Sequence, residues 1–126
     1  STYMNLSGKA VRYWLQKLSL KQESLLVVTD DLNIKFGSVR IRPNGSDGGH
    51  NGLKHINETF GNHVYARMRV GIGDNFSRGR QVDYVLGKWD KKELETLPDI
   101  IKHAVGGVFA FGTIGITETM NKFTKK

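Results

Sequence analysis

The chain has 126 residues, of which 38% are hydrophobic and 25% are charged, which excludes a disordered or fibrous protein and fits one globular domain. It has no cysteine, so disulfide scaffolds and Cys-ligated zinc sites are excluded. Lys and Arg number 19 against 12 Asp and Glu, and the resulting net charge of +7 favours a polyanionic partner such as nucleic acid. No apolar run reaches the roughly 20 residues of a membrane span, so no membrane partner is expected.

Hydrophobic periodicity predicts helices that alternate with strands. In chain order we expect a helix over about residues 7–18, strands over 25–28 and 38–42, a helix over about 51–59, a strand over 67–72, a short extended piece over 82–86, a helix from 91 and a last helix over about 117–123. Asn5 or Ser7 is expected to cap the first helix and Asp90 the long one. Pro98 should kink or split the long helix, and Gly112 should break the chain before the last one.

This order of elements predicts an α/β fold, with a mixed, mostly parallel sheet and helices on both faces, in a single domain. The apolar run Leu25–Val28 indicates a strand that is buried on both faces. Strand alternation places Arg40 and Arg42 on one face of their strand, and Arg67 and Arg69 on one face of theirs.

The most informative segment runs from Gly45 to Lys54, with the sequence GSDGGHNGLK. Its four glycines allow tight turns and close approach to a ligand, and the helix N-terminus that follows favours an anion. His50 and Asn51 lie where the turn becomes the helix. Two readings stay open at this point, a binding loop or a plain turn in which Asn51 is the N-cap. The segment is not a P-loop, because no Gly-Lys-Ser/Thr follows it.

Asp30 is expected at the carboxyl end of a buried strand, where open α/β sheets place their sites. A carboxylate there can orient an imidazole and stabilise its protonated form, but it can equally be a turn residue, and Asp31 competes for the role. The other histidines, His55, His63 and His103, form no metal-binding pattern and are expected at the surface or partly buried. With no cysteine and no Gly-x-Ser-x-Gly elbow, a hydrolase built on this chain would use water as its nucleophile.

Basic side chains flank the glycine-rich loop and the third strand. They are Arg40, Arg42, Lys54, Arg67, Arg69, Arg78 and Arg80. Arginine can grip phosphate with two parallel hydrogen bonds, although a solvated charged face is the alternative for any one of them. The terminal Lys122, Lys125 and Lys126 are expected to form only a soluble tail.

Taken together, five stretches resemble the bacterial-type peptidyl-tRNA hydrolase family. They are residues 3–11 (YMNLSGKAV), 25–32 (LLVVTDDL), 45–54 (GSDGGHNGLK), 67–73 (RMRVGIG) and 85–88 (VLGK), in the order that the family has them. The resemblance implies an enzyme of translation that hydrolyses the ester joining a peptide to the 3′ end of tRNA, without metal or cofactor. It also implies a protein that is a monomer when complete and that works in the cytoplasm, or in an organelle of a eukaryote.

The resemblance assigns roles to residues of this chain. Asp30 matches the carboxylate that supports the catalytic histidine. The matches to substrate-binding residues are Tyr3, Met4, Asn5, His50 and Asn51. The matches to the phosphate clamp are Arg69 with Arg78 or Arg80, on a surface that Lys54, Arg40 and Arg42 would extend.

The chain departs from the family in one respect. Family members carry an N-terminal segment with the first strand, an Asn-Pro-Gly turn and an Arg-His-Asn motif that holds the catalytic histidine, and these 126 residues contain none of them. We therefore expect residues 1–126 to be the C-terminal part of one domain, with unpaired strand edges, exposed apolar faces and little or no activity alone. A fragment of a longer enzyme and a natural chain without its catalytic part both fit, and the absent initiator Met favours the fragment.

Two other functions stay open at this point. One is a non-catalytic RNA-binding relative, like the organellar splicing factors that resemble this hydrolase. The other is a remnant that acts only as an interaction module.

Overall fold

The computed structural model describes residues 7–73 and 90–125, which form two compact units. Among these residues, the first unit contains 7–25 and 43–66, and the second contains 26–42, 67–73 and 90–125. Each unit thus joins segments that are distant in sequence. The extended piece expected over 82–86 and the Asn5 cap lie outside the described residues.

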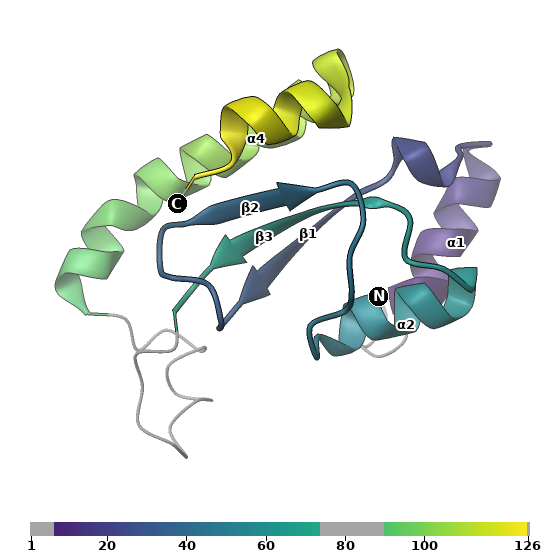
Figure 1. Ribbon diagram of the computed structural model, residues 1–126, viewed down its shortest axis with the longest axis horizontal. Coiled ribbons are helices and arrows are strands. Elements are labelled where there is room, and N and C mark those ends of the chain that lie inside the picture. Colours follow the sequence, from purple (N-terminus) through teal and green to yellow (C-terminus); the bar gives the residue numbers. More distant parts are fainter. Residues whose placement is uncertain (1–6, 74–89, 126) are drawn as a thin grey trace. The chain divides into compact units, whose positions relative to one another are not determined.

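The first unit is a pair of helices, α1 (Ser7–Lys17) and α2 (Asn51–Phe60), with a short 3₁₀ turn at Gln22–Ser24 (Figure 1). Both helices begin and end within one residue of the positions expected, and Ser7 is already the first helical residue of α1. The apolar residues of α1 recur at helical spacing but are only partly buried. Val11 and Leu15 are half-buried, whereas Trp14 and Leu18 are 54% and 59% exposed.

Gly8 brings α1 close to α2. Its backbone N–H donates a hydrogen bond to Nδ1 of His55, over 2.9 Å. A Cβ at this position would come within 2.6 Å of the His55 carbonyl oxygen and would also collide with the Thr59 hydroxyl. The helices can therefore approach this closely only because residue 8 has no side chain.

The second unit contains a sheet with the order β1-β3-β2. Its strands are β1 (Leu26–Asp31), β2 (Val39–Arg42) and β3 (Ala66–Gly71). β2 and β3 are antiparallel, with Ile41 opposite Met68, and Figure 1 shows β1 and β3 running in the same direction. The sheet is thus mixed, as predicted, and it belongs to an α/β fold.

The core of this unit lies between the sheet and α4 (Lys91–Phe123). Val39, Ile41 and Met68 have no exposed surface at all. Against them pack Leu26 and Val70 from the sheet, and Ala104, Ile116, Met120 and Phe123 from α4. One face of the sheet is therefore apolar and covered by α4. That helices cover both faces remains a prediction.

The outer strand β1 is less buried than its apolar sequence predicts. Leu26 packs against the core, but Val28, which alternation places on the same face, is 49% exposed. α4 packs mainly on β2, and in the described sheet β1 has a neighbour only on one side. The expectation that this strand is buried on both faces is wrong for these residues.

α4 begins where the sequence predicts and breaks where it does not. Asp90 caps it in a capping box, in which its side chain accepts from the Glu93 N–H (2.8 Å) and the Glu93 side chain accepts from the Asp90 N–H (3.1 Å). We expected a kink or split at Pro98 and a break at Gly112. The backbone leaves the helical conformation at Gly115 instead, where φ is 82° and ψ is 176°. Pro98 is exposed, so water can satisfy the carbonyl that its missing N–H leaves unpaired.

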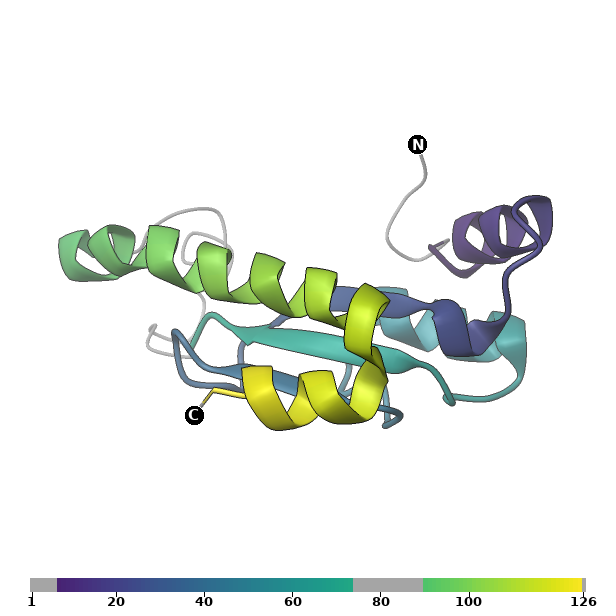
Figure 2. The ribbon, with the colours of Figure 1, turned by 90° about the horizontal axis from the view of Figure 1, so that it is seen from above.

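At Gly115 the helix turns back along the sheet, as Figure 2 shows. This reversal carries the chain end to β2. Val39 and Lys125 exchange two backbone hydrogen bonds of 2.7 Å, so the last described residues extend the sheet by one bridge. Lys125 is thereby paired with β2, and Lys122 lies within α4, so the expectation that these two lysines form only a soluble tail is wrong.

α4 is also long and apolar enough to cross a membrane, although no such segment was expected. Only the length and the composition of α4 suggest that it could cross a membrane. Helices that pack on a sheet can have the same length and composition, and α4 packs on the sheet through Ala104 and Met120. Only 17% of its most apolar stretch is buried in the structure. α4 therefore has an apolar outer surface as well as an apolar inner one.

Candidate functional site

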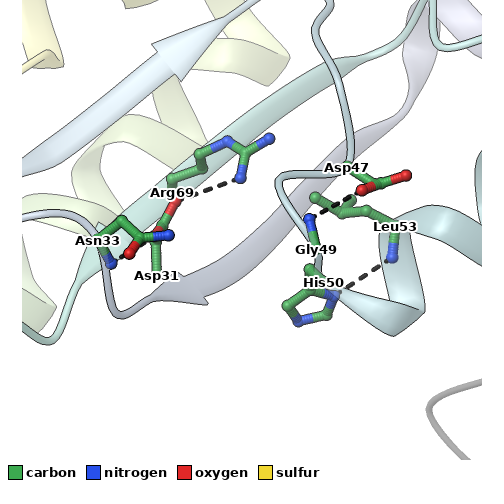
Figure 3. Close-up of polar contacts among 7 residues, drawn as sticks. All are labelled: Asp31, Asn33, Asp47, Gly49, His50, Leu53 and Arg69. Carbon is green, nitrogen blue, oxygen red and sulfur yellow. Dashed lines mark hydrogen bonds and ion pairs between the residues drawn. The ribbon is translucent and has the colours of Figure 1, made fainter. Parts of the chain in front are cut away.

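The two adjacent aspartates at the end of β1 have different environments. Asp31 accepts a hydrogen bond from the Asn33 N–H (2.8 Å) and pairs with the Arg69 guanidinium (3.2 Å), as Figure 3 shows. Its side chain is only 14% exposed. Asp30 points to the opposite face of the strand and is exposed. The Asp31 carboxylate thus has local partners, and Asp30 lies at the carboxyl end of β1 with an exposed side chain.

Four arginines share the face of the sheet opposite α4. Arg40 lies directly across from Arg69, and Arg42 from Arg67. Both predicted pairs on common faces are therefore confirmed. Like charges placed directly opposite each other destabilise a sheet, and Asp31 offsets the charge of Arg69 through their ion pair. An arrangement with this cost is typical of a surface that binds an anion.

The members of this face differ in accessibility. Arg40 and Arg42 are exposed on the edge strand β2, whereas Arg67 is only 1% exposed and the Arg69 side chain only 16%. Asp31 lies on the same face as its partner Arg69, so strand alternation puts Asp30 on the other face. Within this unit the structure thus separates the exposed carboxylate from the arginines.

A basic pocket of about 600 Å³ adjoins the edge of β2. It is lined by Ile34, Lys35, Ser38, Arg40, Arg42, Thr124 and Lys125. Four of these seven residues are cationic and none is acidic, which suits a phosphate group. Lys35 and Lys125 were not expected here. Lys35 is near β2 in sequence, four residues before Val39, whereas no local signal could have found Lys125, because the return of α4 and the Val39–Lys125 pairing bring it to β2.

The glycine-rich loop of the first unit is a turn built around Asp47. The Asp47 side chain accepts from the Gly49 N–H (2.8 Å) and its carbonyl accepts from the His50 N–H (2.9 Å). His50, rather than Asn51, is then the N-cap of α2, because its Nδ1 accepts from the Leu53 N–H over 3.2 Å (Figure 3). The expectation that Asn51 might cap the helix is wrong.

This cap fixes the chemistry of the His50 ring. Since Nδ1 accepts a hydrogen bond, the proton of the neutral imidazole is on Nε2. Asn51 is the first residue of α2 and is exposed, and Lys54 is exposed one turn later. The helix start therefore presents an amide and an ammonium group beside an imidazole of fixed tautomer.

The other predicted site residues, Tyr3, Met4, Asn5, Arg78 and Arg80, lie outside the described residues. The remaining histidines are structural or exposed, as expected. His55 accepts the Gly8 N–H, Nε2 of His103 lies 2.7 Å from the Phe123 carbonyl oxygen, and His63 is at the surface. Within residues 7–73 and 90–125, no three acidic or histidine side chains are grouped as metal ligands.

Comparison with known proteins gives one consistent result. The family model for peptidyl-tRNA hydrolase matches residues 1–126. The chain is 54% identical over 123 residues to the peptidyl-tRNA hydrolase of Porphyromonas gingivalis, covering 98% of this chain and 66% of that protein. It is 48% identical over 126 residues to that of Cytophaga hutchinsonii, covering 100% and 67%.

A solved structure agrees in fold. The crystal structure of peptidyl-tRNA hydrolase from Acinetobacter baumannii superposes with a TM-score of 0.83 and 32% identity, over 98% of this chain and 62% of that one. The chain thus spans about two thirds of the length of the relatives that it matches. Because the family model matches it from end to end and relatives are about half identical to it, the chain belongs to the peptidyl-tRNA hydrolase family.

Proposed function

We propose that the full-length protein containing this chain hydrolyses the ester bond of peptidyl-tRNA and so returns tRNA to translation in the cytoplasm. The match of all 126 residues to the peptidyl-tRNA hydrolase family carries this proposal. The position of Asp30 supports it, since an exposed carboxylate at a strand end can support a histidine base. Asp31 is half-buried, and its carboxylate pairs with Arg69.

The chemistry requires a base, a water molecule and donors for the developing charge. In the proposed reaction an imidazole takes a proton from water, the oxygen attacks the ester carbonyl, and the bond to the ribose oxygen breaks as that oxygen takes the proton from the imidazolium. Asp30 accepts the other N–H of that imidazole, which fixes its tautomer and stabilises the imidazolium. The resemblance assigns the imidazole to an Arg-His-Asn motif, which these residues lack, so Asp30 is a positioning residue.

The proposed substrate-binding residues fall into two groups. In the first, Asn51 and His50 at the start of α2, with Tyr3, Met4 and Asn5, are proposed to bind the peptide and the terminal nucleotide. In the second, the basic pocket and the arginine face are proposed to bind tRNA phosphates, and this group contains Lys35, Arg40, Arg42, Arg69 and Lys125. Lys54, Arg78 and Arg80 are proposed to extend it.

The test is hydrolysis of N-acetylaminoacyl-tRNA by the full-length protein. We expect turnover by the wild type and a kcat lower by about 10²–10⁴-fold in Asp30→Asn, with KM within a few-fold, because the amide no longer supports the imidazolium. Asp31→Asn is the matched control and should keep kcat within a few-fold. Equal losses in both variants, or a normal kcat in Asp30→Asn, would remove Asp30 from this role. Tight tRNA binding without any turnover would favour a non-catalytic RNA-binding protein.

A further inference from the structure

α1 carries two aromatic rings on its exposed surface. Tyr13 and Trp14 are each 54% exposed, and their rings meet edge to face with centroids 5.3 Å apart. The Lys17 ammonium lies 5.6 Å from the Tyr13 ring centre and 5.8 Å from that of Trp14. The lysine and the two rings thus form one surface cluster, in which the aromatic faces attract a cation.

The charged side chains of α1 itself are all positive. Lys9, Tyr13 and Lys17 are spaced by four residues and so follow one line along the helix, with Arg12 beside it. Between Ser7 and Gln22 the chain has no acidic residue. An apolar protein partner would have to remove these cations from water, whereas a polyanion with flat bases would pair with them and stack on the rings.

A shallow groove of about 380 Å³ borders the same face. It is lined by Arg12, Leu15, Gln16, Leu20, Gln22, Thr59 and Phe60. Arg12 therefore brings a cation of α1 into this groove. The lining combines an aromatic ring with amide groups and one cation and includes no carboxylate, which suits a nucleobase and its phosphate better than an acidic or purely apolar ligand.

We propose that Arg12, Tyr13, Trp14 and Lys17 form an RNA-binding platform, here called the α1 platform, with the adjoining groove. The proposal rests on the proposed function, and it assigns to α1 a contact with tRNA away from the reacting ester. Trp14 is six residues from Gly8, or about 9 Å along the helix. Gly8 donates a hydrogen bond to His55 of α2, and α2 begins at the His50 cap and Asn51. The platform and the start of α2 therefore belong to one pair of packed helices.

The consequence is a selective effect on long substrates. The proposed contact is with a part of tRNA beyond its 3′-terminal nucleotides, so a substrate that ends at these nucleotides lacks it. Loss of one stacked base or one phosphate contact should raise KM for intact tRNA about five- to tenfold and leave kcat unchanged. It should leave both constants unchanged for the same ester on a short 3′-terminal oligonucleotide.

The experiment uses Trp14→Ala and Lys17→Glu in the full-length protein. Matched controls on α4 are Phe109→Ala, at a ring that is 73% exposed, and Lys102→Glu, the same charge reversal at another exposed lysine. KM for N-acetylaminoacyl-tRNA and for the short ester is measured at several salt concentrations. Thermal unfolding shows whether each variant is folded, and Lys17→Glu, a surface change, keeps the test valid if Trp14→Ala unfolds.

The proposal is supported if both platform variants raise KM for intact tRNA alone and Lys17→Glu lowers the salt slope by about one. It is overturned if they behave like the α4 controls, or if short and long substrates are affected equally. If the wild type hydrolyses neither substrate, the proposed function fails. The affinity of the same four variants for fluorescent tRNA then tests, separately, whether the α1 platform binds RNA. Normal RNA affinity in both platform variants would indicate a protein partner instead and would overturn the proposal.

Discussion

Gly8 is the position at which a single methyl group should do the most damage to the first unit. In Gly8→Ala the new Cβ lies within 3 Å of the His55 carbonyl oxygen (2.6 Å) and Nδ1 (2.9 Å), so α1 must move off α2. Relief of such overpacking costs about 1–3 kcal/mol. The weakened N–H to His55 hydrogen bond costs about another 1 kcal/mol. The helix propensity of alanine returns about 1 kcal/mol, so the net loss should be about 1–3 kcal/mol.

Urea unfolding of the full-length protein measures this loss, and Gly112→Ala provides the control. Gly112 is also helical, but a Cβ there has no neighbour within 4 Å, so this substitution should be neutral or stabilise by up to about 1 kcal/mol. Equal effects of the two substitutions would refute the reasoning, because they would show that close helix contact at Gly8 does not matter. The same would follow if Gly8→Ala were more stable than the wild type.

The remaining predictions concern charge and backbone conformation. Arg69→Ala should weaken tRNA binding several-fold and reduce the salt slope by about one, whereas Asp31→Asn should tighten binding, because it releases the Arg69 guanidinium from its 3.2 Å ion pair. Fluorescence anisotropy with labelled tRNA checks both, and weaker binding in Asp31→Asn would contradict the assignment. Gly115→Ala should cost about 1–3 kcal/mol through its φ of 82° alone, since nothing crowds a Cβ there. Calorimetry against Gly112→Ala tests this, and equal unfolding midpoints would show that the reversal of α4 does not need glycine.

Local elements followed from the sequence because their causes are local. The spacing of apolar residues located α1 and α2. Strand alternation placed Arg40 and Arg42 on one face of β2, and Arg67 and Arg69 on one face of β3. Asp90, followed by Glu93, marked the start of α4. Motif spacing in the glycine-rich segment and its neighbours indicated the family, which the comparison over residues 1–126 confirms.

Contacts between distant segments could not be predicted in this way. Nothing near Asp30 in the sequence distinguishes it from Asp31, because the distinction comes from Arg69, 38 residues after Asp31. Likewise, Trp14 fits a buried stripe as well as Val11 does, and its exposure depends on which side of α1 packs in the folded unit.

The sequence by itself determined the periods, caps and motifs, each of which depends on side chains a few residues apart. Tertiary structure decided that Asp31 pairs with Arg69, where α4 turns back, and that Lys125 joins Arg40 beside β2. The physical reason is that these features depend on which surfaces exclude water together, and that is fixed only when segments far apart in the chain have packed.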